Sequence, residues 1–195
     1  MSHQLRPESF DPYTFPLRSW WFIRPAGIHG LTHTRRVLIH AVAIAESVAL
    51  EPAEFESLVR AVAWHDIGRT HDGWERDHGA KSVARIKELD LACDVAPEVL
   101  APLLFAIEWH STDDELAVEA AARVPEAMRP ADPQPKAEAP GQGHARDSRL
   151  RVLWVLKDAD GLDRVRIHDL DVSKLRSETA RAREAEAWRL LKEMP

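Results

Sequence analysis

Cysteine is nearly absent from the sequence, since Cys93 is the only one among 195 residues. A single cysteine excludes an intramolecular disulfide framework and any zinc site built from several thiolates. No secretory signal pattern opens the sequence, so we expect a reducing compartment, the cytoplasm. If a metal ion binds, its ligands are therefore nitrogen and oxygen atoms.

Long apolar runs and an excess of basic charge are also missing. No stretch of about 18 apolar residues is present, so we expect no membrane-spanning helix. The 32 acidic and 26 basic side chains give a formal net charge of −6, which argues against an extended nucleic-acid footprint. The composition, 45% hydrophobic and 30% charged, is typical of one folded domain of this length. Histidine, in contrast, is abundant, with ten residues.

The hydrophobic pattern predicts helices and no strand, and hence an all-α fold. Residues 1–28 hold four prolines and are expected to form an irregular N-terminal arm. Residues 29–195 form the predicted domain, with a mobile loop at 124–147, where five prolines gather, and a C-terminal helix. The expected helices cover 33–48, 52–66, 78–91, 97–110, 113–123, 150–163 and 177–193.

Polar side chains stand where the apolar stripes reach the helix ends. Asp66 continues the stripe of Val59 and Val62, which directs a carboxylate into the core. A buried carboxylate without a partner is costly, so it normally pairs, takes up a proton or binds a metal ion. The same kind of position is occupied by His33, His65, His78, His110 and Asp160. Imidazole and carboxylate together suit Mn, Fe, Ni, Zn or Mg, so the pattern predicts a site for one or two divalent ions.

The chain resembles the HD-domain metal-dependent phosphohydrolase superfamily in five segments that occur in the expected order. They are HGLTHTRRV, AVAWHDIGRTHDG, DHGAKSVARI, IEWHS and LKDADGLDRVR, and they span roughly residues 29–167. The resemblance implies a compact bundle of α-helices with a central metal site. The ligands that it implies are His33, His65, Asp66 and Asp160.

Two choices at this site remain open in the sequence. Asp158 competes with Asp160 for the last ligand position, and the helical phase favours Asp160. In members of the superfamily with two ions, further histidines lie on the two helices after the HD pair, and His78 and His110 resemble them. With two ions Asp66 would bridge them. With one ion, His78 and His110 would instead contact the substrate or a metal-bound water.

Phosphate binding requires cations near the motif. Arg69, directly after the HD pair, is the first candidate, and Lys81 and Lys157 are the others. His110 is a further candidate for substrate contact. The alternative for each of Arg69, Lys81 and Lys157 is that the residue is an ordinary solvated side chain at the surface.

Acidic and aromatic side chains of the segment between the ligands complete the candidate site. Asp72 and Asp77, together with Asp66, are the catalytic candidates, as general acid–base groups or as partners of the ligands. Trp74 stands in a polar loop and is a candidate to stack on a base or ring of the substrate. His29 precedes His33 by one turn and is a candidate pocket residue.

The implied function is hydrolysis of a nucleotide or another small phosphate ester by a metal-activated water. One alternative is a di-iron oxygenase, because members of the same superfamily use six such ligands to bind two irons. The other is a non-catalytic sensor that binds a nucleotide. The expected partner is a small phosphorylated substrate, and no contact with a membrane is expected.

Overall fold

The computed structural model describes residues 9–123 and 147–195, and within these ranges every regular element is an α-helix or a 3-10 helix. The all-α prediction is confirmed. The α-helices are α1 (Leu31–Val48), α2 (Pro52–Trp64), α3 (His78–Glu88), α4 (Pro97–Trp109), α5 (Asp114–Ala122), α6 (Ser148–Leu162), α7 (Glu178–Arg181) and α8 (Glu184–Glu193). The 3-10 helices are η2 (Ser19–Trp21), η5 (Asp163–Ile167) and η6 (Val172–Lys174). The predicted loop lies outside the described residues except for Asp147, whose side chain caps α6.

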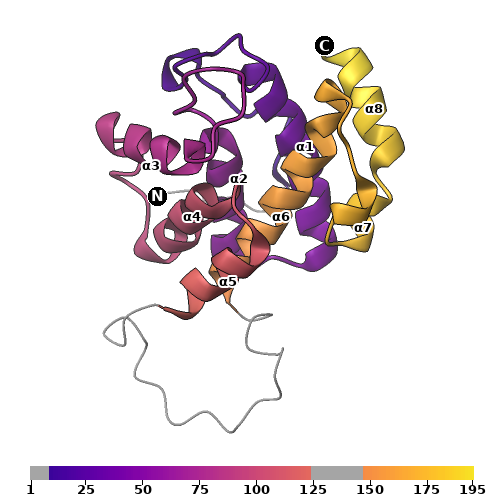
Figure 1. The fold of residues 1–195 in the computed structure, drawn as a ribbon. Helices are drawn as coiled ribbons and strands as arrows, with labels where there is room; N and C mark the ends of the chain where they lie inside the picture. Colours follow the sequence, from indigo (N-terminus) through magenta and orange to yellow (C-terminus); the bar gives the residue numbers. More distant parts are fainter. Residues whose placement is uncertain (1–8, 124–146) are drawn as a thin grey trace, which may run out of the picture.

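Helices α1, α2, α4 and α6 pack against one another around the core (Figure 1). Helix α6 runs between α4 and α1, α3 covers the outer side of α4, and α7 and α8 lie beside α1. Apolar side chains from all four central helices are completely buried, including Leu38, Phe55, Leu103 and Leu156. Burying such a side chain contributes about 1.5–3 kcal/mol, so this core holds the helix ends in place.

Most observed helix ends lie within three residues of the predicted ones, and two of the differences affect the surroundings of buried histidines. Helix α2 ends at Trp64, so His65 and Asp66 lie in the turn that follows it instead of in its last turn. The single helix expected over 177–193 is divided into α7 and α8 by a turn at Ala182 and Arg183. At this turn the side chain of Arg183 points inward and donates a hydrogen bond to the buried ring of His40.

The N-terminal arm is held against the turn after α2. Phe22 is buried, and the amide of Ile23 donates to the carbonyl of Ile67 over 3.1 Å. This contact brings the segment before α1, which contains His29, to the same end of the bundle as Asp66. No helix in the described part of the chain combines the length and the apolar character needed to cross a membrane.

Candidate metal centre

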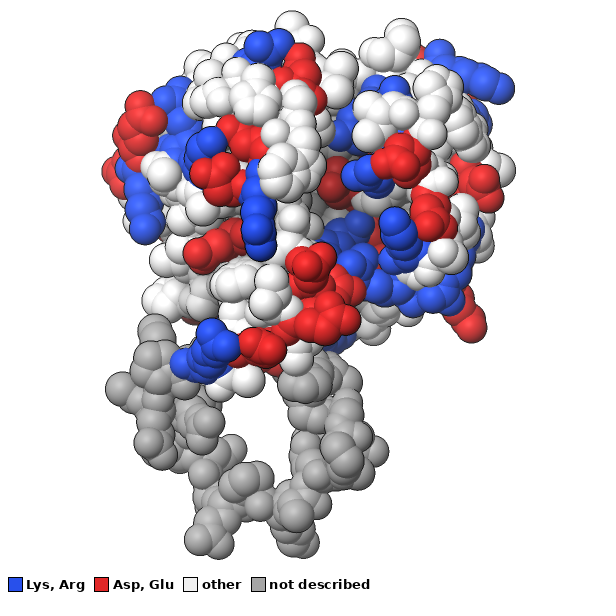
Figure 2. All heavy atoms as spheres, viewed as in Figure 1, with Lys and Arg blue, Asp and Glu red and all other residues white. Residues whose placement is uncertain are grey.

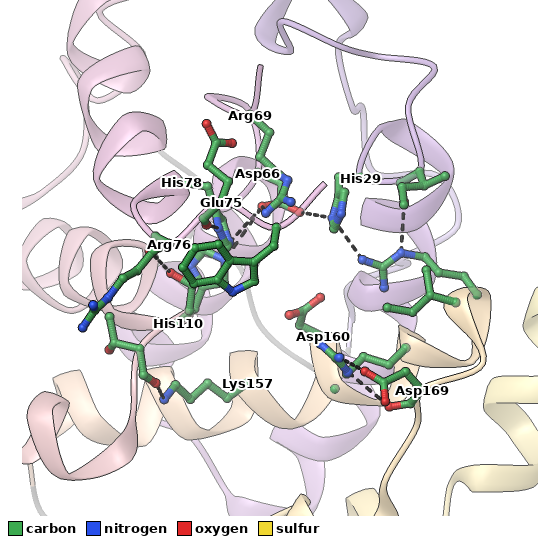
Figure 3. Close-up of a pocket in the computed structure, with 18 of the residues that line it drawn as sticks. His29, Asp66, Arg69, Glu75, Arg76, His78, His110, Lys157, Asp160 and Asp169 are labelled. Atoms are coloured by element: carbon green, nitrogen blue, oxygen red, sulfur yellow. Dashed lines mark hydrogen bonds and ion pairs between the residues drawn. The ribbon is translucent and has the colours of Figure 1, made fainter. Parts of the chain in front are cut away.

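Asp66 lies at the centre of a histidine cluster, and its two carboxylate oxygens face different histidines (Figure 3). Oδ2 lies 3.5 Å from Nε2 of His33 and 3.5 Å from Nε2 of His65. Oδ1 lies 3.5 Å from Nε2 of His78 and 3.8 Å from Nε2 of His110. The nitrogen donors therefore form two adjacent pairs with one carboxylate between them. His65 lies close to the second pair as well, because donor atoms of His65, Asp66 and His110 lie within 4.8 Å of one another.

Asp160 belongs to the first of these groups. Its Oδ1 lies 3.4 Å from Nε2 of His33, and donor atoms of His33, His65 and Asp160 all lie within 4.8 Å of one another. Asp158, in contrast, accepts hydrogen bonds from the backbone amides of Arg176 and Ser177 at 2.7 and 2.8 Å. Asp160 is thus in the cluster, while Asp158 holds the segment before α7.

Three of the histidine rings are oriented by the same local hydrogen bond. In each ring Nδ1 donates to the backbone carbonyl three residues earlier, which is an acceptor only. The pairs are His65 with Val62 (2.8 Å), His78 with Glu75 (2.5 Å) and His110 with Ile107 (2.7 Å). Because Nδ1 carries the proton, the neutral ring directs the Nε2 lone pair into the cluster, as a metal ligand must.

The uncompensated polar atoms of the cluster fit a bound divalent cation. Nε2 of His33 lies 3.1 Å from Nε2 of His65, and the corresponding distance between His78 and His110 is 2.8 Å. Two lone pairs repel each other at this distance unless a cation or a proton lies with them. Oδ1 of Asp66 is buried and accepts no hydrogen bond from the residues that the structure describes, which is costly for a carboxylate. Imidazole and carboxylate groups are also the donor set that divalent transition metals prefer.

The pKa shifts keep most of these groups in the form that binds metal. Burial lowers the pKa of His65 to about 3 and that of His78 to about 4, so both rings are neutral at pH 7. Burial alone would raise the pKa of Asp66 and Asp160, but the neighbouring histidines hold both carboxyl groups well below their usual range. Burial opposes a charge on His33, yet its hydrogen bonds to carboxylates raise its pKa overall.

Gly79 explains how His78 reaches His110. A Cβ atom at Gly79 would lie 2.4 Å from the carbonyl oxygen of Ile107 and 2.7 Å from that of Glu108, so only glycine allows α3 to approach the end of α4 so closely. In the same segment, the hydroxyl of Ser82 accepts a hydrogen bond from the amide of Gly68 over 3.1 Å. The segment His78–Ser82 therefore supplies one candidate ligand and two close packing positions.

Gly79→Ala is expected to destabilise the protein and to disturb the pair of His78 and His110. Overpacking of this kind costs about 1–3 kcal/mol, because the backbone of α4 cannot yield as a side chain would. Denaturant unfolding of the metal-free protein measures the effect. Gly73→Ala is the matched control, since a Cβ there meets only the ring of His71, at 3.3 Å. Equal stability of the two variants would contradict the proposed role of Gly79.

Asp163 supports His33 from outside the cluster and was not singled out from the sequence. Its Oδ2 accepts a hydrogen bond from Nδ1 of His33 over 2.7 Å, which leaves Nε2 of that ring for the cluster. Arg36 holds Asp163 in turn, with Nε donating to Oδ1 over 2.6 Å. The spacing in the sequence could have indicated Asp163, because it follows Asp160 by three residues and so lies on the same side of the helix.

A pocket of about 810 Å³ opens onto the cluster, and two of the predicted cations line it. Arg69 is buried, donates to the carbonyl of Gly73 over 2.8 Å, and has an Nε that lacks a hydrogen-bond partner within residues 9–123 and 147–195. The ammonium of Lys157 is held by the carbonyl of Thr112 at 2.5 Å and the carboxylate of Asp114 at 2.6 Å. Of these two cations, Arg69 is therefore the one with a donor that the described residues leave unpaired, and its Nη1 lies 3.9 Å from Oδ1 of Asp66.

The structure does not bring Lys81 and Asp77 into the pocket. The ammonium of Lys81 forms ion pairs with Glu75 at 2.5 Å and Asp77 at 3.1 Å, and neither Lys81 nor Asp77 lines the pocket. The prediction that Lys81 binds substrate and Asp77 takes part in catalysis therefore lacks structural support. Asp72, in contrast, does line the pocket, where its carboxylate pairs with Arg24 at 2.7 Å.

Arg166 and His29 join the site from the side opposite His78 and His110. Nδ1 of His29 lies 3.0 Å from Oδ2 of Asp66 and 3.0 Å from Nη2 of Arg166. Donor atoms of His29, His33 and Asp66 also lie within 4.8 Å of one another. The sequence indicated His29 but not Arg166, although Arg166 follows Asp163 at the helical spacing of three residues.

The comparison with protein families agrees with this site. The family model described as HD domain matches residues 30–165, which is more than half of the chain, so the chain belongs to the HD-domain family. The matched region contains both groups of donors around Asp66. Comparison with curated proteins and comparison with solved structures each find no match.

Proposed function

We propose that this HD-domain protein is a metal-dependent phosphohydrolase that acts on a nucleotide or another small phosphate ester. The observation that carries the proposal is the position of Asp66, whose two oxygens face different pairs of histidines. This arrangement supports two ions that share one carboxylate. Divalent ions, when bound, supply Lewis acidity that activates water and offsets negative charge on phosphoryl oxygens.

The ligands divide between the two ions according to the distances in the cluster. The first ion would be held by His33, His65, Asp160 and Oδ2 of Asp66. The second would be held by His78, His110 and Oδ1 of Asp66. The second group offers one protein donor fewer, so more of its coordination positions are available to water or substrate.

The cations of the pocket orient the phosphoryl group. Arg69 is the main candidate, because its guanidinium is fixed by Gly73 and its Nη1 lies only 3.9 Å from Asp66 Oδ1. Lys157 contributes positive charge on the other wall of the pocket, although Asp114 offsets part of it. Asp72 is the candidate for proton transfer, since its carboxylate lines the pocket without facing a metal-binding nitrogen.

The face shown in Figure 2 fits a small substrate better than a long polyanion. Acidic and basic side chains are interspersed over the face shown in Figure 2, so this face presents no continuous basic stripe. We therefore keep the expectation that no extended nucleic-acid contact is made. We also place the protein in the cytoplasm, where the exposed, unpaired Cys93 would stay reduced.

The oxygenase alternative shares the six donors of the cluster, because a histidine-rich pair of sites also suits iron. It predicts that the purified protein contains iron and consumes oxygen. The sensor alternative differs again, since it requires nucleotide binding that persists in His65→Ala and no turnover of any phosphate ester.

Elemental analysis of protein purified without chelator or an affinity metal distinguishes these functions. We expect about two divalent ions per chain and release of phosphate from small esters that stops when a chelator removes the metal. Two irons, a mixed-valence EPR signal and oxygen uptake would instead establish the oxygenase. Phosphate release that survives complete metal removal would contradict the proposed function.

A further inference from the structure

The rim of the pocket carries exposed apolar side chains, in contrast to its charged interior. Ile28, Trp74 and Ile167 line the pocket and are exposed to 46%, 85% and 40%. They are three of the eight large apolar side chains that are exposed in the described ranges. Exposed apolar groups gathered beside a polar cavity are a mark of ligand binding.

The three rim residues come from separate segments that the structure ties together. Nε of Arg166 donates to the carbonyl of Ile28 over 3.0 Å, which joins the end of η5 to the arm. On the other side, a Cβ at Gly27 would lie 2.6 Å from Oδ1 of Asp72, so the arm also abuts the loop that carries Trp74. The segments that carry the three rim residues are therefore joined to one another beside the pocket.

Trp74 is the largest member of the rim, and its indole has no partner in the described part of the chain. No ring stacks on it and no cation lies over it there, whereas Trp21, Trp64, Trp109, Trp154 and Trp188 each contact a ring or a cation. An indole prefers a planar group on its face, and an aromatic contact of this kind adds to the energy of simple apolar burial. Its free face is available to a ligand that enters the pocket.

We propose that the rim of Ile28, Trp74 and Ile167 binds an aromatic or heteroaromatic ring of the substrate, which stacks on Trp74 while the phosphate lies at the metal centre. This inference rests on the proposed function and narrows it to phosphate esters that bear a planar ring. Phosphorylated sugars without a ring of this kind then use the phosphate site alone and bind more weakly.

Adenosine 5′-monophosphate and ribose 5-phosphate form a matched pair of probes, because they differ only by the base. Their affinities for the metal-loaded full chain are measured by calorimetry, with phosphate release followed in parallel. We expect the nucleotide to bind about tenfold more tightly, as base stacking on an aromatic side chain typically allows. Trp74→Ala is expected to remove this preference by weakening the nucleotide only, and Trp74→Phe to retain part of it.

Trp20→Ala is the matched control, because Trp20 is 58% exposed but does not line the pocket. It is expected to leave both affinities unchanged. Equal binding of the two probes by the unmodified protein would overturn the role of the rim and leave the proposed function standing, as would an equal loss for both probes in Trp74→Ala. Binding of neither probe by the metal-loaded protein would overturn the role of the rim, and the lack of metal-dependent phosphate release from any other small ester as well would overturn the proposed function.

Discussion

Asp66→Ala is expected to abolish metal binding, because both groups of donors depend on this one carboxylate. It supplies Oδ2 to the group of His33 and His65, and Oδ1 to the group of His78 and His110. Substitution of a residue that only supports a ligand typically costs 10–100-fold in metal affinity, so loss of a shared ligand should cost at least about 100-fold for each ion. Elemental analysis after gel filtration should find fewer than one ion per chain.

Asp66→Asn tests whether metal binding depends on the charge of this side chain or only on its shape. The amide keeps the volume but offers one oxygen instead of two, so it too should fail to serve both groups of histidines. Asp94→Asn, at an exposed carboxylate away from the site, is the control and should retain the full metal content. A folded Asp66→Ala protein with both ions would refute the assignment of Asp66, and circular dichroism establishes that the variant has folded.

His110→Ala is expected to remove one ion and to leave the other. The ring of His110 is buried, and its Nε2 lies 2.8 Å from that of His78, so the second group keeps only two protein donors without it. The first group retains His33, His65, Asp160 and Oδ2 of Asp66. We therefore expect the metal content to fall from about two ions to one, with loss of most phosphate release, since two ions stabilise both reacting oxygens.

His71→Ala is the matched control for this experiment. His71 lies on the loop before α3, its side chain is 53% exposed, and it does not line the pocket. The control should keep both ions. If His110→Ala also kept both ions, His110 would not be a ligand. Its remaining role would be the alternative given by the sequence, contact with the substrate. Loss of both ions in folded His110→Ala would show that the two groups do not bind metal separately.

Two histidines of this centre, His65 and His110, also complete the helices that precede them. The rings of His65 and His110 donate to carbonyls in the last turns of α2 and α4, which would otherwise lack a partner. One side chain thus ends the helix and presents its remaining nitrogen to the cluster. This double role explains why these two donor positions coincide with helix ends, as the apolar stripes of the sequence predicted.

The charged residues around the site show where prediction from the sequence stops. Arg69 and Lys81 are both cations near the HD pair, yet Arg69 faces the pocket while Glu75 and Asp77 hold Lys81 outside it. Such pairing depends on which loop residue turns inward, and neither periodicity nor spacing records that. The same reason explains why Arg166, which contacts His29 from a distant segment, was not found.

By itself, the sequence determined the all-α fold, the HD-domain family and the residues around Asp66, and the phase of Asp160 on its helix distinguished it from Asp158. These features follow from the local period of 3.6 residues per turn and from a motif, so no long-range contact is needed to recognise them. Only the tertiary structure decided that the two oxygens of Asp66 face different histidines, that Asp163 holds His33, and that Ile28, Trp74 and Ile167 form one rim. Each of these depends on atoms from distant segments meeting at distances of a few ångströms, which are set by the packing of the helices and the arm.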